Sequence, residues 1–439
     1  MPRRPPAISP TTRCPGLTIS TNRKDAALIS TDGDAAAARW LLSPEAVRTQ
    51  AHGLLAAAER NELQHFSFDA GRLGFAADYV TGTIRQNYPA LDIPYHARWR
   101  HFVVDGTDRW AASPPASLDD PLERARIRID LAVTSVLLDA GAGDAWRYRD
   151  AKTGKSIARS EGLAIASLDA FLDGLFSADV DQPARTDAPA LTAIDDASLA
   201  AAFQVTDENP LAGLSGRTGL LNRLGHTLQD KPQFFAADAP RIGNLADHFV
   251  SLARDGTLPA ATILTTLLEA FADIWPGRLE MAGRNLGDTW RHPAAHRQDA
   301  ADGHVPFHKL SQWLSYSLVE PLSELGLAVT GPDDLTGLAE YRNGGLMIDT
   351  GLLRPKHDGI LSTLHEPGSE IIVEWRALTV ALLDRLADAV RERLGKTPAE
   401  LPLAAVLEGG TWAAGRRIAR ETRTDGSPPL NIVSDGSVF

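Results

Sequence analysis

The sequence predicts a mostly α-helical, multi-helical protein with few short strands. Apolar residues recur at helical spacing in several segments, whereas the apolar and polar alternation of a half-buried strand is scarce. Helix-starting residues precede such segments, as where Ser43 can cap an alanine-rich run that begins with Pro44. We therefore expect helices over residues 43–59, 121–140, 161–177, 210–228, 243–254 and 260–274.

Two later helices contain the polar residues of greatest interest. The first has leucines every four residues, which predicts a buried apolar stripe. These are Leu310, Leu314, Leu318 and Leu322. Another face of this helix could line a pocket with Lys309, Gln312, Trp313, Tyr316 and Glu320. The second helix should run from about Arg376 to Leu394 and bury Leu378, Leu382, Leu386 and Val390.

The length of 439 residues favours two helical lobes, or one lobe with a wrapped extension, because single hydrophobic cores usually stop growing at about 250–300 residues. Residues 1–42 mix prolines with Ser, Thr and Asp and should form an extended N-terminal arm. An N-terminal helical lobe should follow over 43–180. Residues 178–200 lack aromatic side chains and read as a boundary or connector. A C-terminal helical lobe over 200–439 should carry the functional site.

Composition narrows the possible partners and location. The net charge of -12 argues against a nucleic-acid partner, although one basic pocket could still hold a phosphate. The single cysteine, Cys14, excludes an intrachain disulfide and a cysteine-rich zinc site. No apolar run approaches the length of a membrane span, so we expect a cytoplasmic protein without a membrane partner. Oligomeric state is left open.

The segment from Asp333 to Gly345 carries the strongest chemical signal. It places carboxylates, a phenol, an arginine and an amide among glycines. Such a set can protonate a leaving group, stabilise a cation and bind an anion. The candidates in it are Asp334, Glu340, Tyr341, Arg342 and Asn343.

A structural interpretation of the same segment is also open. Asp333 or Asp334 could cap a short helix through Ala339, since both residue types favour that position. Glu340 and Arg342 could then form a surface ion pair of little energetic consequence.

Two other segments could bind an anion. Residues 96–102 interleave cations and aromatic rings, which can hold an anion or simply stack on one another. Residues 209–225 place Arg217 among small residues, so a backbone and a guanidinium could approach a phosphate together. A plain loop is an equally good interpretation of the second segment.

Four histidines form two pairs with the spacing that puts two imidazoles on one helix face for a metal. These are His292, His296, His304 and His308. Pro293 and Pro306 lie inside the two pairs and disfavour continuous helical turns. Loop histidines bonded to the backbone are therefore the better interpretation.

Several motifs are recognisable together. They are Phe307–Leu314 (FHKLSQWL), Leu335–Gly345, Val373–Thr379 and Glu408–Trp412, with further motifs at Arg98–Phe102, Arg159–Leu163 and Ser434–Gly436. Together they resemble a uracil-catabolism family of unknown function found in fungi and bacteria, which operates beside a ring-opening enzyme. The likeness spans nearly the whole chain.

A second pattern covers residues 307–385. Its positions are Phe307, Lys309 and Gln312, then Glu340, Tyr341 and Arg342, then Glu374 and Arg376. This pattern is similar to the queuosine salvage nucleosidase family, which implies a fold related to helical DNA glycosylases. One position departs from the pattern. The nucleosidase helix carries an aspartate thought to act at the sugar, and Ser317 stands there in this chain.

Together the two resemblances imply an N-ribosyl hydrolase that releases urea from ribosylurea 5-phosphate or a related ring-opened nucleotide, with no metal or redox cofactor required. The expected catalytic carboxylate is Glu340, with Glu320, Asp334 and Glu374 in reserve. Phosphate binding is expected from Lys309, Arg217, Arg342 and Arg376. Urea is expected to contact Gln312, Tyr341 and Asn343, and the sugar to pack on Trp313 or Trp375.

Two alternatives remain. One is a metal-dependent amide or ureido hydrolase that uses the four histidines. The other is a non-catalytic, ligand-binding partner of the ring-opening enzyme, because a fold does not by itself imply an activity.

Overall fold

A computed structural model describes residues 1, 32–112, 119–275 and 279–433. Helices dominate it, so the predicted fold class is confirmed. The α-helices are α1 (Asp32–Leu41), α2 (Pro44–Glu59), α3 (Leu73–Asn87), α4 (Arg109–Ala112), α5 (Pro121–Leu137), α6 (Arg159–Leu172), α7 (Ala188–Ala193), α8 (Asp196–Ala202), α9 (Leu214–Asp230), α10 (Pro232–Phe235), α11 (Leu245–Leu252), α12 (Ala260–Ala270), α13 (Lys309–Glu324), α14 (Tyr341–Asp349), α15 (Glu370–Leu394), α16 (Leu403–Val406) and α17 (Ala413–Thr422). The relation to the nucleosidase fold stays a prediction.

Shorter helical turns and two-stranded ribbons join these helices. The 3₁₀ turns are η1 (Ala70–Arg72), η2 (Arg98–Phe102), η3 (Ile242–Asn244), η4 (Ala272–Ile274) and η5 (Pro332–Asp334), and a π-helix, η6 (Leu407–Trp412), joins α16 to α17. The antiparallel pairs are β1 (Phe66–Phe68) with β12 (Leu353–Pro355), β2 (Val103–Val104) with β3 (Thr107–Asp108), β4 (Tyr148–Arg149) with β5 (Ser156–Ile157), β7 (Glu280–Met281) with β8 (Arg284–Asn285), and β9 (Thr289–Arg291) with β10 (His304–Pro306). The parallel pairs are β6 (Thr257–Pro259) with β11 (Ala328–Thr330) and β13 (Leu364–His365) with β14 (Asn431–Ile432).

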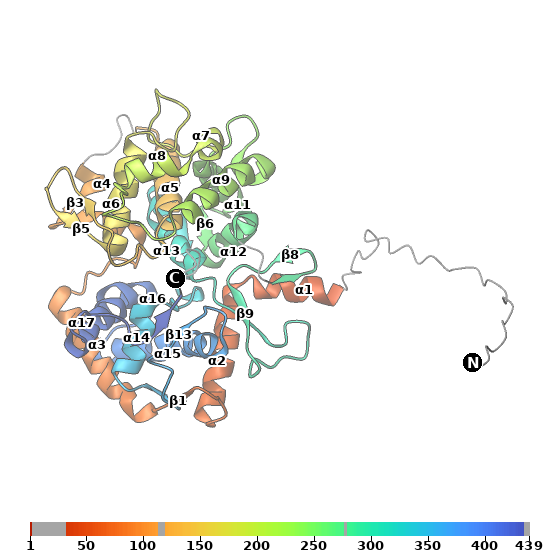
Figure 1. The fold of residues 1–439 in the computed structure, drawn as a ribbon, viewed down its shortest axis with the longest axis vertical. Coiled ribbons are helices and arrows are strands. Elements are labelled where there is room, and N and C mark those ends of the chain that lie inside the picture. Colours follow the sequence, from red (N-terminus) through yellow and green to blue (C-terminus); the bar gives the residue numbers. More distant parts are fainter. Residues whose placement is uncertain (2–31, 113–118, 276–278, 434–439) are drawn as a thin grey trace.

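The two ends of the chain pack together. Helix α15 contacts both α2 and α3, and α17 contacts α3 and α14. These elements occupy the lower half of Figure 1, whereas α4 to α12 occupy the upper half and α13 lies between the halves. Helix α13 packs against α5 and α12. Its Gln312 and Tyr316 bond Thr336, which lies in the segment leading to α14.

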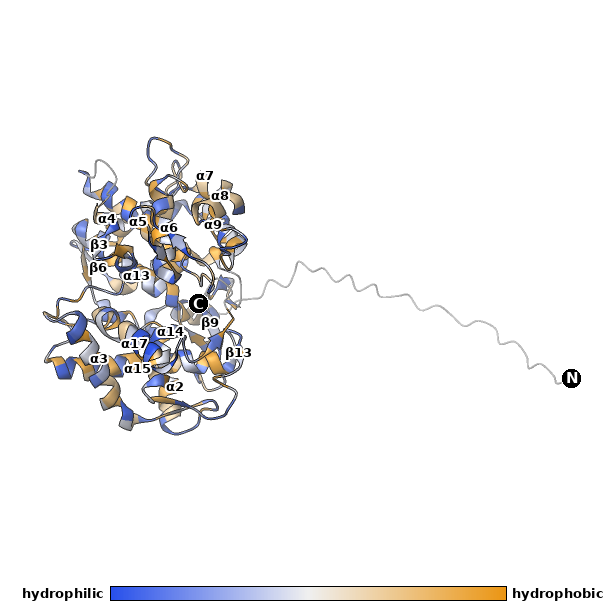
Figure 2. Cartoon of the chain, turned by 60° about the vertical axis from the view of Figure 1, so that its left-hand side comes forward, coloured by the Kyte–Doolittle hydropathy of each residue, from blue (hydrophilic) through white to orange (hydrophobic). Residues whose placement is uncertain are grey.

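One hydrophobic cluster runs through both halves, from Val47 in α2 to Leu430 near the end of the described chain. The stripe predicted on α13 contributes to it, since Leu314, Leu318 and Leu322 are buried. Figure 2 shows the helices carrying hydrophilic and hydrophobic residues side by side. Across the described ranges, no helix is both long and apolar enough to cross a membrane.

Local sequence signals locate most helices well. Ser43 caps α2 as predicted, its hydroxyl accepting the backbone N–H of Ala46 at 3.2 Å. Helix α15 begins at Glu370, earlier than the predicted Arg376, because the buried face already starts at Ile372. The alternative in which Asp333 or Asp334 caps a short helix through Ala339 is wrong, because residues 335–339 form no helix. Instead Glu340 caps α14 with its carboxylate.

Helices also occur where we expected none. Helix α1 lies within the predicted arm, whose residues 2–31, with Cys14, fall outside the described residues. The segment 178–200 contains α7 and the start of α8, with Leu191 and Leu199 buried, so it is not a bare connector. The division into lobes 43–180 and 200–439 stays a prediction.

The α14 and α17 interface gives a test of this packing. A Cβ added at Gly415 would come closer than van der Waals contact to the backbone carbonyl of Arg342. We expect Gly415→Ala to lower the free energy of unfolding by about 1–3 kcal/mol, the range for overpacking a core. Urea denaturation measures it.

Gly82→Ala is the matched control, because a Cβ at this exposed position in α3 meets no atom within 4 Å. It should stabilise the helix slightly, since alanine has the higher helix propensity. Equal unfolding curves for the two variants would contradict the close helix approach.

Candidate functional site

Several chain segments converge where the two halves meet. The end of α5 and the start of α6 come from one half, and the start of α14 and the η6–α17 helix come from the other. The start of α13 and the turn η2 complete the set. We call this the arginine–aspartate site, after Arg98 on η2 and Asp139 after α5.

A buried ion pair lies at its centre. Arg98 is fully buried, and its Nη1 lies 3.1 Å from Asp139 Oδ2, whose side chain is 6% exposed. Arg98 Nε donates to Ser135 Oγ at 2.7 Å. Burial raises the pKa of Asp139, while Arg98 and the hydroxyl of Ser160 oppose that shift. Asp139 is therefore a carboxyl group whose proton is held more tightly than in water.

Arg217 fixes the loop that carries Asp139. Its Nε donates to the carbonyl of Leu138 at 3.1 Å, and its other nitrogens donate to the carbonyls of Ala140, Gly141 and Ala212. Burial lowers the pKa of Arg217 to about 10. These carbonyls occupy the guanidinium, so Arg217 positions the loop in this structure, and its phosphate role stays a prediction.

Ser317 on α13 holds Arg98 from the opposite side. Its hydroxyl donates to the Trp313 carbonyl at 2.9 Å and accepts the backbone N–H of Arg98 at 2.9 Å. The Ser317 carbonyl accepts the indole N–H of Trp99 at 2.7 Å. The position where the nucleosidase pattern has an acid is thus structural here. A carboxylate reaches the same neighbourhood from α5 instead.

Lys309 begins α13 in a field of carboxylates. The preceding His308 adopts a left-handed backbone with φ of 48°, which sets the direction in which the helix starts. Burial of the Lys309 ammonium lowers its pKa, and the charge of Arg376 lowers it further. The carboxylates of Glu340, Asp288 and Asp139 act in the opposite direction and raise it. Lys309 therefore lies between acidic groups from three separate segments.

Aromatic rings form one wall of the site. Trp313 stacks on His96 with ring centroids 6.0 Å apart and meets the edge of His101 at 5.4 Å. Trp412 of η6 closes the group at 5.8 Å from His101. Burial and the charge of Arg98 hold the pKa of His101 well below its usual value, so its imidazole is neutral.

Four buried polar atoms around this wall have no hydrogen-bond partner. They are Arg98 Nη2, Asp139 Oδ1, His101 Nδ1 and Trp313 Nε1. Buried polar groups are almost always paired in native proteins. Donors and acceptors of this kind, gathered from three segments, make this neighbourhood a candidate site for a polar ligand.

A cationic rim borders the site. Burial lowers the pKa of Arg342, and Arg159 and Arg416 lower it further, which places the three guanidinium groups in one neighbourhood. Arg159 has a φ of 57° at the first position of α6, and Ala158 before it offers no side-chain cap. The start of α6 therefore keeps N–H groups that can bind an anion beside these arginines.

Glu340 has a structural role that the sequence left open. Its carboxylate accepts the backbone N–H groups of Arg342 at 2.9 Å and Asn343 at 2.6 Å, which caps α14. It does not form the alternative surface ion pair with the Arg342 side chain among the described contacts, since Arg342 Nη1 donates to the Gly426 carbonyl at 3.0 Å. Glu340 also faces Lys309 electrostatically, so a catalytic role stays a prediction.

Three residues predicted to contact the substrate instead form hydrogen bonds within the protein. The amide of Gln312 exchanges hydrogen bonds with Thr336. Asn343 donates to the Leu338 carbonyl and accepts from the hydroxyl of Thr411. Trp375 donates to the Gly344 carbonyl at 3.1 Å and is 1% exposed. We assign these residues to the fold, because buried groups already paired offer a ligand little.

Arg376 is also paired. Its two terminal nitrogens each lie 2.8 Å from an oxygen of Asp288, and its guanidinium covers the Phe307 ring at 4.0 Å. Asp288 accepts the backbone N–H of Lys309 at 3.1 Å as well. Arg376 therefore orients the start of α13, and Asp288 occupies the fork expected to bind phosphate.

The remaining predicted residues lie apart or at the edge. Glu320 is bonded by Arg100 at 2.8 and 2.9 Å, three turns along α13 from Lys309. Asp334 is exposed on η5. Tyr341 is half-buried at the start of α14, near the rim.

The four histidines do not gather. His304 Nδ1 lies 3.0 Å from the Asp302 carbonyl, and His308 Nε2 lies 2.8 Å from the Leu41 carbonyl. His296 is exposed. Only His292 meets a carboxylate, with its Nε2 3.4 Å from Glu374 Oε2. The described residues therefore give no four-histidine metal centre, because each imidazole has a different neighbour.

Sequence reasoning missed the centre of the site. Asp139 follows the end of α5 without any motif, so its role depends on tertiary contacts. Arg98 and His101 lay in the segment of interleaved cations and aromatics, and Arg159 lay in a motif of the family resemblance. Arg416 had no signal beyond its distance of four residues from Trp412.

Comparison with known proteins identifies the family. A family model described as protein of unknown function (DUF1688) matches residues 40–439. The chain belongs to this family. It is 42% identical over 409 residues to Protein urg3 of Schizosaccharomyces pombe, a match that covers 91% of this chain and 98% of that protein. It is 36% identical over 421 residues to Uracil catabolism protein 4 of Lachancea kluyveri, covering 87% and 94% respectively.

These relatives confirm the family that the motifs indicated. The fainter likeness of residues 307–385 to the queuosine salvage nucleosidases stays a prediction. The paired and unpaired groups described above, rather than that likeness, support the roles assigned below.

The Asp288–Arg376 pair gives a second prediction. Burial alone would raise the pKa of Asp288, but the charge and hydrogen bonds of the Arg376 guanidinium have the larger effect. They lower the pKa of Asp288 to about 2. Asp288→Asn should lower the free energy of unfolding by about 3–5 kcal/mol, because it leaves a buried charge unpaired. Asp299→Asn, which breaks the exposed pair with Arg297, is the control and should cost far less.

Acid titration checks the same pair independently. Because the folded pKa of Asp288 is lowered, its stabilisation is present above the ordinary value of 3.8 and is lost as pH falls toward about 2. Chemical denaturation at several pH values should show this loss in the wild type and a weaker loss in Asp288→Asn. An identical pH dependence in both would contradict the assignment.

Proposed function

We propose that this protein acts in uracil catabolism as an N-ribosyl hydrolase that releases urea from ribosylurea 5-phosphate or a closely related ring-opened nucleotide. The observation that carries the proposal is Asp139, a buried carboxyl group with one oxygen free of hydrogen bonds beside buried cations. The name of the Lachancea kluyveri relative supports the pathway. The resemblance to nucleosidases supports the bond that is cleaved.

Hydrolysis of this bond places positive charge on C1 of the ribose in the transition state. A carboxylate next to C1 stabilises that charge and can take a proton from the attacking water. Asp139 Oδ1 is suited to this, since its other oxygen already pairs with Arg98. Arg98 keeps Asp139 in place and favours its ionised form.

The departing urea needs a proton. The C1–N bond breaks with its electron pair going to the urea nitrogen, and Lys309 can supply the proton because burial lowers its pKa. Water then supplies the oxygen at C1, and its proton passes to Asp139. The products are ribose 5-phosphate and urea, so atoms and charge balance without a redox partner.

The rim provides the phosphate site. Arg342, Arg159 and Arg416 lie together beside the start of α6, and guanidinium groups match phosphate oxygens in geometry. Trp313, whose ring is covered by the Arg98 guanidinium at 5.6 Å, forms the wall beside which the sugar would lie. Glu161, which pairs with Arg416, keeps that arginine oriented before the phosphate arrives.

Asp139→Asn tests the carboxylate. We expect kcat for urea release to fall by about 100-fold or more, the usual contribution of a positioned acid or base. Asp144→Asn, an exposed aspartate in the same loop, is the control and should keep full activity. Binding of ribose 5-phosphate to Asp139→Asn, measured by calorimetry, shows that the site remains folded.

A pH profile tests the role of Asp139, and two variants separate it from Glu340. Because the pKa of Asp139 is raised, an activity that needs its carboxylate should rise with pH above the ordinary carboxyl value of 3.8. If Glu340→Gln abolished urea release while Asp139→Asn retained it, Glu340 rather than Asp139 would be the catalytic carboxylate. Wild-type protein that binds the compound but releases no urea would instead support the ligand-binding alternative.

Arg342→Ala and Arg416→Ala test the phosphate site. Each should weaken binding of ribosylurea 5-phosphate by about 10-fold or more and leave its dephosphorylated analogue nearly unchanged, because one charge-assisted bond is lost. Arg417→Ala, exposed and paired with Glu421, is the neighbouring control. Equal weakening of both compounds would exclude a phosphate role.

A further inference from the structure

A second polar cluster surrounds the start of α15, separate from the arginine–aspartate site. It consists of His65, which precedes β1, and of Glu370 and Glu374, one turn apart on α15. One ligand atom from each of these residues lies within 4.8 Å of the other two. Within the described residues, no other group of three His, Cys, Asp or Glu side chains gathers this closely.

Glu374 is held in place with one oxygen left over. Its Oε1 accepts the backbone N–H groups of His65 at 3.1 Å and Phe66 at 2.7 Å, which ties β1 to α15. Its Oε2 has no hydrogen-bond partner, although the residue is 0% exposed. A buried carboxylate oxygen is costly unless a proton donor or a cation compensates it.

The ring of His65 is oriented by a second histidine. Its Nδ1 lies 3.0 Å from Nε2 of His357, so one of these nitrogens donates and the other accepts. When His65 donates from Nδ1, its Nε2 carries a lone pair that faces the carboxylates. This arrangement, in which one ring nitrogen is fixed by a hydrogen bond and the other is available, is typical of metal-binding histidines.

The spacing within the cluster suits a shared ion. His65 Nε2 lies 3.4 Å from Glu370 Oε1 but forms no hydrogen bond. Two ligands that each lie about 2.1 Å from one ion at a tetrahedral angle are about 3.4 Å apart. A cation between the two atoms therefore explains a distance at which no hydrogen bond forms.

His292 supplies the outer layer of the cluster. Its Nδ1 accepts the backbone N–H of Ala294 at 3.1 Å, which leaves the proton of the neutral ring on Nε2. That atom lies 3.4 Å from Glu374 Oε2. His292 thus orients Glu374 rather than binding the ion itself.

We propose that His65, Glu370 and Glu374 bind one divalent transition-metal ion, with His292 and His357 as the residues that orient these ligands. One imidazole and two carboxylates suit Zn²⁺ or Mn²⁺. Three protein ligands also leave coordination positions for water or a small ligand.

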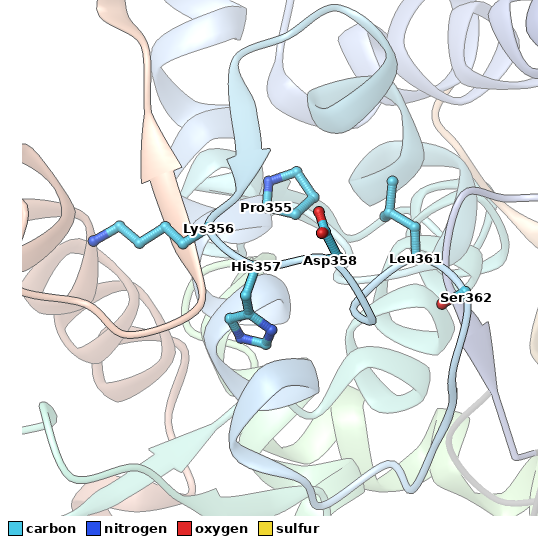
Figure 3. Close-up of a pocket in the computed structure, with 6 residues that line it drawn as sticks. All are labelled: Pro355, Lys356, His357, Asp358, Leu361 and Ser362. Atoms are coloured by element: carbon cyan, nitrogen blue, oxygen red, sulfur yellow. The ribbon is translucent and has the colours of Figure 1, made fainter.

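A pocket lies next to the cluster, on the side of His357. His357 lines it with Pro355, Lys356, Asp358, Leu361 and Ser362, and it encloses about 430 Å³ (Figure 3). Figure 3 shows Lys356 pointing away from the other labelled residues, and its ammonium donates to the Leu63 carbonyl at 2.5 Å. The pocket therefore lies beside the histidine that orients His65. This inference is independent of the proposed hydrolase, because no residue of the arginine–aspartate site takes part.

The test is metal binding to untagged, full-length protein after treatment with a chelator. Calorimetric titration with ZnCl₂ and, separately, MnCl₂ should show saturable binding of one ion per chain to the wild type for at least one metal. Glu370→Gln and His65→Asn should each weaken that binding by about 10-fold or more. His357→Ala should weaken it within the range of about 10- to 100-fold seen when an outer residue is lost.

Glu370→Gln is the decisive variant, since its side chain is 40% exposed and its replacement leaves the core intact. The melting temperature of the wild type should rise with the metal, and that of Glu370→Gln should not. Glu62→Gln and His226→Ala, both exposed, are the matched controls and should bind like the wild type. The proposal would be overturned if the wild type showed no saturable metal binding. It would also be overturned if Glu370→Gln and His65→Asn bound the metal as tightly as the wild type.

Discussion

The ion pair between Arg98 and Asp139 lies at the junction of the two halves, and contacts from neighbouring segments hold both residues in position. Arg217 binds the carbonyls on both sides of Asp139, and Ser317 binds the backbone of Arg98. Removing a charge pair from water is costly unless its remaining donors and acceptors are satisfied. The free atoms Asp139 Oδ1 and Arg98 Nη2 are therefore notable, because they are the positions at which the protein leaves that cost uncompensated.

The same constraint explains why the arginines divide into two groups. Arg217 donates its hydrogen bonds to backbone carbonyls, and Arg376 donates to Asp288. Both arginines thereby hold the backbone in place. Arg342, Arg159 and Arg416 lie at the rim, where they repel one another electrostatically. Repulsion among like charges is relieved when an anion binds, so the rim is the part of the site with a physical reason to take a phosphate.

The π-helix η6 and the left-handed residues near the site serve the same geometry. Trp412 at the end of η6 meets His101, and His308 and Arg159 adopt positive φ directly before α13 or at the start of α6. Such backbone conformations cost free energy and persist where the surrounding contacts compensate for them. Their position at the starts of the two helices that face Asp139 indicates that the direction of these helices is under constraint.

The sequence by itself determined the helical fold class, the positions of α2, α5, α9, α12 and α13, and the family. Those features depend on local capping, helical periodicity and contiguous motifs, all of which are readable along the chain. It also singled out Glu340, Arg342 and Lys309, which do face one another at the junction.

Only the tertiary structure decided which charged side chains are free to act. Arg217, Gln312, Asn343 and Arg376 read from the sequence as ligand contacts, but each is paired with a group far away along the chain or across a helix interface. Asp139 has no local signal, and it becomes a candidate catalytic group because packing buries it beside Arg98 and leaves one oxygen unpaired. Hydrogen-bond pairing and burial are properties of contacts between distant segments, and a spacing pattern within one segment does not contain them.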